Sequence, residues 1–117
     1  MAIHDYYYLS CTAPTEAPRN FAVTAINRTA IEVKWRLPPF DSRGGTILGY
    51  RLFYQLAELE GEEEEIMVNI MSNATETYVV SDLEPDTMYN FSILAYTSVG
   101  DGPRSSTLTT ATLSKNI

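Results

Sequence analysis

Few side chains in this sequence are of the types that carry out covalent chemistry. Its 117 residues include one histidine, His4, and one cysteine, Cys11, and both precede the first regular pattern near Phe21. Catalysis by a nucleophile needs that nucleophile beside a general base that activates it. No Cys-His or Ser-His-Asp set can be assembled from the later part of the chain, so we expect a protein that is not an enzyme.

Acidic side chains form the one strong charge feature. The formal net charge is -7, and six of the fifteen acids fall in one short segment. These six are Glu58, Glu60, Glu62, Glu63, Glu64 and Glu65. Such a run is typical of a solvated hairpin turn. A cation site or a docking patch for a basic partner is the alternative, but the spacing of a calcium loop is missing.

The other charges argue against several classes of ligand. Outside the acidic run, nine acids face eight bases, whereas a nucleic-acid surface needs a basic face. A single cysteine excludes an internal disulfide and a cysteine-rich zinc site. Gly100 and Gly102 lack the strand-to-helix context of a phosphate-binding loop. We therefore expect no nucleic acid partner, no metal and no cofactor.

The sequence contains three sequons, which are candidate sites of N-linked glycosylation. They begin at Asn27, Asn73 and Asn90 and read Asn-Arg-Thr, Asn-Ala-Thr and Asn-Phe-Ser. This pattern is the acceptor for N-linked glycans, although it also arises by chance. Two of the three fall in expected turns, and Asn90 should face solvent because its neighbours alternate inward. We expect at least one of them to be glycosylated.

The elements that hold these residues are indicated by alternation of apolar and polar side chains. A period of two residues is typical of a strand with one buried face. The inward sets are Phe21 and Val23; Ile31, Val33 and Trp35; Tyr50, Leu52 and Tyr54; Tyr78 and Val80; and Phe91, Ile93 and Ala95. No segment shows a helical stripe, so the pattern predicts an all-β chain.

Turn residues separate these runs. Asn27-Arg28, Pro38-Pro39, Gly44-Gly45, Glu60-Gly61 and the stretch from Gly100 to Pro103 each interrupt the alternation. About seven short strands without helices favour an antiparallel sandwich of two sheets, with a closed barrel as the alternative. We expect an N-terminal tail or linker over residues 1–16, one domain over 17–113 and a C-terminal tail over 114–117.

One stretch predicts a fixed corner between the sheets. Leu83 would plug the end of the core, Pro85 would fix the backbone, and the hydroxyl of Tyr89 would bond a backbone group upstream. Phe91 stands where an antibody-type sandwich has its second bridging cysteine. The core is therefore expected to hold without a disulfide.

Taken together, these residues resemble a fibronectin type III domain over about residues 17 to 113. The resemblance is carried by Ala17-Pro18, Trp35 with Pro38-Pro39, Ile47 with Gly49-Tyr50, Leu83-Glu84-Pro85 with Tyr89, Ala95, and the stretch from Gly100 to Pro103. It implies a seven-strand, immunoglobulin-like Greek-key sandwich. Sheet A-B-E would face sheet C-C′-F-G, and the core would contain Trp35, Tyr50, Leu83, Tyr89 and Phe91.

The resemblance also implies a function. We expect a binding or spacer module from the extracellular region of an adhesion or receptor protein, either membrane-anchored or secreted, with no direct membrane contact. Its partners would be proteins and neighbouring domains of its own chain. An elastic spacer of an intracellular filament-associated protein is one alternative, and a cytokine-binding receptor domain is another.

Contact residues are expected in two loops and on one sheet face. The candidates are Asp41 and Arg43 in the loop over residues 40–46, Asp101 and Arg104 at the loop over 98–103, and the outward pair Phe53 and Tyr96. Some family members bind integrins through an Arg-Gly-Asp loop at the second position. Here the loop has Gly100 and Asp101 but no arginine before them, so that activity is not inferred.

Overall fold

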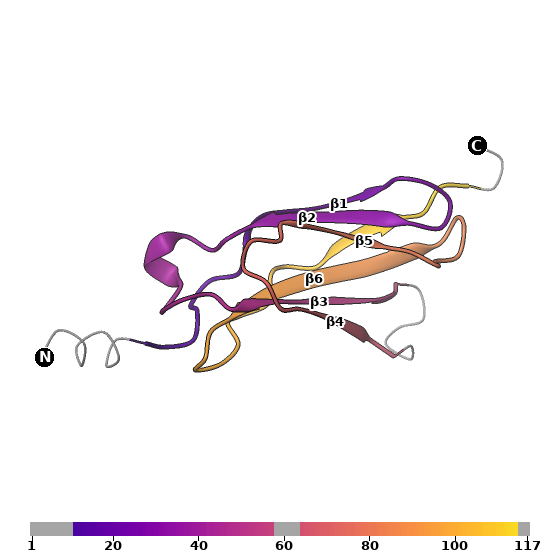
Figure 1. Ribbon diagram of the computed structural model, residues 1–117. Coiled ribbons are helices and arrows are strands. Elements are labelled where there is room, and N and C mark those ends of the chain that lie inside the picture. Colours follow the sequence, from indigo (N-terminus) through magenta and orange to yellow (C-terminus); the bar gives the residue numbers. More distant parts are fainter. Residues whose placement is uncertain (1–10, 58–63, 115–117) are drawn as a thin grey trace, which may run out of the picture.

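The computed structural model describes residues 11–57 and 64–114, and the regular elements among them are strands and one short 3-10 turn (Figure 1). Alternating β-branched and aromatic residues favour extended backbone in each run. The elements in chain order are β1 (Arg19–Ala25), β2 (Ile31–Arg36), η1 (Phe40–Ser42), β3 (Gly49–Leu56), β4 (Ile66–Ile70), β5 (Thr77–Val80), β6 (Met88–Tyr96) and β7 (Leu108–Ala111). The residues at the tip of the acidic run, 58–63, lie outside the described residues, as does His4.

The strands form two antiparallel sheets. One sheet has the order β1-β2-β5 and the other has the order β4-β3-β6-β7. Strand β5 leaves its sequence neighbour β4 and pairs with β2 in the opposite sheet. This crossover confirms the predicted Greek-key sandwich and its division into three and four strands.

The core lies between the inner faces of the sheets. Trp35 on β2 is 1% exposed, and its ring meets the edge of Tyr50 on β3 at 5.4 Å between centroids. Tyr54 stacks on Phe91 at 6.0 Å on the same side of the four-stranded sheet. Burial of apolar side chains such as these rings is the main favourable contribution to the stability of a core without a disulfide.

The corner between the sheets contains the hydrogen bond that the sequence predicts for Tyr89. The backbone N–H of Glu84 donates to the hydroxyl oxygen of Tyr89 at 3.0 Å. Leu83 is buried beside it, and its own N–H donates to the carbonyl of Thr29. The segment between β5 and β6 is thereby fastened both to the core and to the turn before β2.

Two local features differ from the sequence pattern. Tyr78 pairs with the buried Val33 but is itself 37% exposed, because β5 is a short edge strand and nothing in the sheet lies beyond it. The pattern also predicts no helix, whereas Phe40–Ser42 forms one 3-10 turn. Three residues are too few to carry a helical stripe, so periodicity could not reveal it.

A lead-in segment, residues 11–16, is attached to the loops at one end of the sandwich. Thr12 N–H donates to the Gly44 carbonyl at 2.7 Å, and Thr15 N–H donates to the Ser42 carbonyl at 2.8 Å. Gly44 has φ +76°, and a Cβ there would lie 2.5 Å from the Thr12 hydroxyl. Glycine therefore lets the segment lie against this loop.

The described chain leaves at the opposite end of the sandwich. After β7, the N–H of Leu113 donates to the carbonyl of Asn27 in the β1–β2 turn. Figure 1 shows this turn far from η1, at the other end of the strands. Within the described ranges, no helix is long and apolar enough to cross a membrane.

Candidate protein-contact surface

The outer face of the four-stranded sheet carries two arginine–aromatic stacks. Antiparallel register places Phe53 of β3 opposite Ser92 of β6, and Gly49 opposite Tyr96. The side chains of Phe53, Ser92 and Tyr96 point away from the core, because the alternate residues Leu52, Ile93 and Ala95 are fully buried. This alternation gives one face on which polar and aromatic groups from distant parts of the chain meet.

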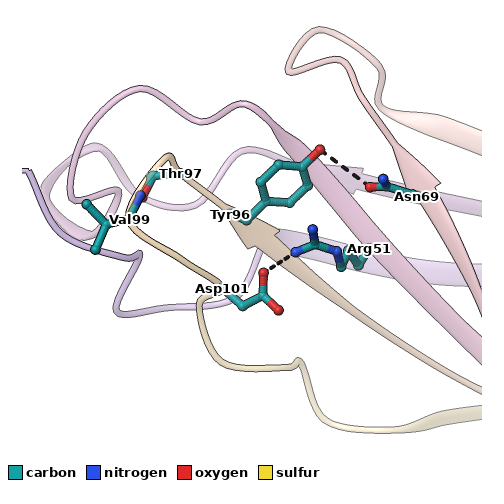
Figure 2. A network of polar contacts seen from close by, with 6 residues as sticks. All are labelled: Arg51, Asn69, Tyr96, Thr97, Val99 and Asp101. Atoms are coloured by element: carbon teal, nitrogen blue, oxygen red, sulfur yellow. Dashed lines mark hydrogen bonds and ion pairs between the residues drawn. The ribbon is translucent and has the colours of Figure 1, made fainter.

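The first stack lies near the β6–β7 loop, and we call it the loop-end cluster: Arg51, Asn69, Tyr96 and Asp101. The Arg51 guanidinium lies 4.2 Å from the centroid of the Tyr96 ring and forms an ion pair with Asp101. The Tyr96 hydroxyl donates to Oδ1 of Asn69 at 3.4 Å. Figure 2 shows these four side chains at the end of β6.

Gly49 explains how the Tyr96 ring reaches across β3 to β4. A Cβ at Gly49 would lie 2.7 Å from the Tyr96 hydroxyl oxygen and would also meet the backbone carbonyl of Ile70. A side chain at this position would therefore push the ring off the sheet. The absence of one lets Tyr96 lie flat enough to hydrogen-bond Asn69.

The loop beside this cluster is held by its own hydrogen bonds. Thr97 N–H donates to the Gly100 carbonyl at 3.1 Å, and Gly102 N–H donates to the Ala95 carbonyl at 2.8 Å. Val99 N–H donates to the Thr97 hydroxyl at 3.2 Å, while the Val99 side chain is 58% exposed (Figure 2). An apolar side chain is thus presented on a well-ordered turn.

The second stack, which we call the Arg104 cluster, consists of Phe53, Glu65, Ser92 and Arg104. The Arg104 guanidinium lies 3.5 Å from the centroid of the Phe53 ring. Its two terminal nitrogens donate to the two carboxylate oxygens of Glu65 at 2.8 and 2.9 Å, and one of them also donates to the Ser92 hydroxyl at 3.4 Å. These hydrogen bonds hold the pKa of Glu65 below its ordinary value and raise that of Arg104.

Four of the six contact candidates that the sequence suggests lie in the two clusters, Tyr96 and Asp101 in one and Phe53 and Arg104 in the other. The other two, Asp41 and Arg43, lie at η1. Arg43 turns back on its own loop, where Nε donates to the Pro38 carbonyl at 2.9 Å. Its guanidinium also stands over the ring of Phe40.

Sequence reasoning missed four members of the two clusters, namely Arg51, Asn69, Glu65 and Ser92. Arg51 is two positions before the outward Phe53 on the same strand, so the period of two residues predicts that both side chains lie on the outer face. Asn69 stands outward on β4, opposite Arg51. Glu65 is the last residue of the acidic run, and the composition of that run does not indicate that Glu65 pairs with Arg104.

The three sequons occupy different places. Asn27 is exposed in the β1–β2 turn, Asn73 lies in the β4–β5 connection, and Asn90 lies on β6. Over residues 11–57 and 64–114, no group of three or more histidine, cysteine or acidic side chains is arranged to hold a metal ion. What the outer face offers is stacking, charge and hydrogen bonding, which are the interactions of protein recognition.

Comparisons with known proteins agree with the two-sheet fold that carries this face. The model of the family described as "Fibronectin type III domain" matches residues 16–111. The chain is 37% identical over 93 residues to mouse protein sidekick-1, covering 80% of this chain and 4% of that protein. It is 36% identical over 93 residues to mouse receptor-type tyrosine-protein phosphatase F, covering 79% of this chain and 5% of that protein.

A solved structure agrees as well. The third fibronectin III domain of the human KIAA0343 protein is 25% identical, with a TM-score of 0.77, and the match covers 86% of this chain and 84% of that one. The chain therefore spans a small part of the curated relatives that it matches and nearly the whole of this single domain.

Proposed function

The chain belongs to the fibronectin type III family, and on that premise we propose that it is a non-catalytic protein-binding and spacer module in the extracellular region of a cell-surface adhesion protein or receptor. The domain covers residues 17–113, with tails over 1–16 and 114–117. One of its relatives is by name a receptor-type protein, which supports the extracellular placement. Because the match covers 5% of that phosphatase, the phosphatase activity is not carried over.

The spacer role is supported by where the chain enters and leaves. The lead-in segment is hydrogen-bonded to the loops at the η1 end, and Leu113 is hydrogen-bonded to Asn27 at the other end. A domain with this path would hold a preceding and a following domain apart by the length of the sandwich. The bonds from Thr12 and Thr15 also fix the direction in which a preceding neighbour would lie.

The binding role is supported chiefly by one observation, the loop-end cluster. Binding hot spots are enriched in tyrosine and arginine held in packed surroundings. Arg51 and Tyr96 are stacked and fastened by Asp101 and Asn69 before any partner arrives. Little side-chain entropy would then be lost on binding, and the exposed Val99 adds an apolar anchor beside them.

A binding screen tests this proposal. The domain would be fused to a dimeric carrier and tested against immobilised ectodomains of adhesion proteins and receptors, with a second copy of the domain included. Wild type is compared with Arg51→Ala, which removes the stacked cation. The matched control is Lys34→Ala, because Lys34 is a cation on the opposite sheet whose side chain is 64% exposed.

We expect at least one ectodomain to bind wild type and the Lys34→Ala variant equally. Its affinity for Arg51→Ala should be lower by about tenfold or more, as for the loss of a central contact residue. If no ectodomain binds, or if both variants bind like wild type, the proposed contact role is wrong. Circular dichroism and thermal unfolding of each variant would show that the fold is retained.

A further inference from the structure

The three sequons differ in what their side-chain amides do. A glycan is attached at the amide nitrogen, Nδ2, so the surroundings of that atom decide whether the fold has room for a sugar. Asn27 lies in an open turn, where its Oδ1 accepts a hydrogen bond from the Thr29 N–H at 2.8 Å.

The amide of Asn73 is a structural bridge. Its Nδ2 donates to the carbonyl of the buried Ile47 at 2.9 Å. Its backbone carbonyl accepts a hydrogen bond from the hydroxyl of Tyr50 at 3.3 Å. Asn73 is exposed, but a glycan on this nitrogen would have to lie beside the Ile47 carbonyl that the nitrogen now contacts, so the fold favours the other two sequons as acceptors.

Asn90 is half-buried on the outer face of the four-stranded sheet. It is opposite Gln55 on β3 and Thr109 on β7. The Thr109 hydroxyl donates to Oδ1 of Asn90 at 2.5 Å. Because this bond holds the oxygen toward β7, Nδ2 is on the side of the amide that faces away from that strand.

A surface hollow adjoins Asn90. It has a volume of about 180 Å³, and its lining includes Phe53, Gln55, Glu65, Asn90, Arg104 and Thr107. Donors and acceptors on Gln55, Glu65, Arg104 and Thr107 match the hydroxyl and amide groups of a sugar. The apolar ring of Phe53 lies below them.

We propose that Asn90 carries an N-linked glycan whose first N-acetylglucosamine lies in this hollow against the Arg104 cluster. The inference rests on the proposed extracellular function, since only a chain in the secretory pathway is exposed to the oligosaccharide donor for N-linked glycosylation. The donor is an oligosaccharide on a lipid pyrophosphate. The Asn90 nitrogen bonds to the anomeric carbon, the bond from that carbon to the pyrophosphate oxygen breaks, and lipid pyrophosphate and the amide proton leave.

The fold also sets the time of transfer. The sequon hydroxyl belongs to Ser92, which is 6% exposed and accepts a hydrogen bond from Arg104. The transferase that attaches the glycan can bind the Ser92 hydroxyl only before the Arg104 side chain covers it. Transfer therefore precedes the pairing of β6 with the chain that follows it.

The glycan would divide the outer face into two parts. Asn90 and Tyr96 are six positions apart on β6, which is roughly 20 Å along a strand. A sugar on the Arg104 cluster therefore covers that end and leaves the loop-end cluster open to a protein.

The test begins with site occupancy. The chain would be secreted from animal cells behind an added leader, with a fusion tag that carries its own sequon, and each sequon peptide examined by mass spectrometry. We expect glycan on the Asn90 peptide, none on the Asn73 peptide, and loss of the former in Asn90→Gln. If the Asn90 peptide carries no glycan while the sequon of the tag is glycosylated, the inference is wrong. This result would not bear on the proposed function, because the added leader directs the chain into the secretory pathway in any case.

The position of the sugar is tested by its release from the folded protein. Wild type, Glu65→Gln and Arg104→Ala would be treated with an amide-cleaving glycosidase under native conditions, with Lys34→Ala as the control. If the hollow holds the sugar, release from Glu65→Gln and Arg104→Ala is about tenfold faster than from wild type or Lys34→Ala. Equal rates in all four proteins would show that the sugar does not lie there.

Discussion

Replacing Arg104 with lysine should lower the free energy of unfolding by about 1 kcal/mol although the charge is kept. A cation over an exposed ring contributes about 0.5 to 1 kcal/mol, and an exposed ion pair contributes about 0.2 to 1 kcal/mol. Lysine loses the planar stack on Phe53 and the two-pronged contact with Glu65. The Arg104 side chain is 42% exposed, so solvent screens the ion pair. The expected loss of stability is therefore smaller than the sum of the largest cation–ring and ion-pair contributions.

Urea denaturation of bacterially produced protein would measure this loss without any glycan. The midpoint should fall while the slope of the transition stays unchanged, since the fold is the same. In thermal unfolding, 1 kcal/mol corresponds to a shift of about 4 to 8 °C for a domain of this size. The matched control is Arg36→Lys, because Arg36 reaches Glu76 through one contact of 3.6 Å and its side chain is 59% exposed.

A double-mutant cycle with Glu65→Gln would then assign the pairwise part of the loss. The cycle should give a coupling free energy of about 0.5 kcal/mol. If Arg104→Lys costs no more than Arg36→Lys, the stack on Phe53 contributes nothing to stability. The description of the Arg104 cluster as an ordered surface would then be refuted.

Three further changes have outcomes that follow from single contacts. Tyr89→Phe leaves the backbone N–H of residue 84 without its acceptor and should cost about 1 to 3 kcal/mol in urea denaturation, whereas Tyr54→Phe should cost less than about 0.5 kcal/mol. Hydrogen bonds from Arg104 hold the pKa of Glu65 below its ordinary value, so the carboxylate stabilises the fold fully above its unfolded pKa and this contribution is lost as the pH falls through its folded pKa. The stability difference between wild type and Glu65→Gln, measured by urea denaturation, should therefore shrink as the solution is made more acidic than the ordinary pKa of a glutamate. Gly44→Ala places a Cβ at φ +76° against the lead-in segment and should cost about 1 kcal/mol or more, with faster hydrogen exchange in residues 12–15; unchanged exchange there would contradict the account of that loop.

Local patterns in the sequence were sufficient to predict the frame. Alternation in one strand sets its buried face, so Ile31, Val33 and Trp35 could be assigned to the core side without knowing their neighbours. The spacing of Leu83, Pro85 and Tyr89 is equally local, because the hydroxyl bonds a backbone group a few residues upstream. Tyr78 shows the limit of this reasoning, since its exposure depends on the edge position of β5.

The contact surface was harder to predict because its members are far apart in the chain. Alternation gives Phe53 an outward direction, but it cannot say that the side chain of residue 104 will lie over its ring. That contact depends on the register of β3 with β6 and on the path of the chain between β6 and β7. The attachment of residues 11–16 to Gly44 is likewise a matter of two loops meeting in space.

The most direct test of the central claim is a hydrogen-exchange footprint of the domain bound to the ectodomain recovered in the screen. The claim is that protein partners contact the end of the four-stranded sheet beside the β6–β7 loop. We predict slower exchange on binding for the amides of residues 98–101, with no change over Ile31–Arg36 of the opposite sheet. Protection on β2 with unchanged exchange in the loop would contradict the claim.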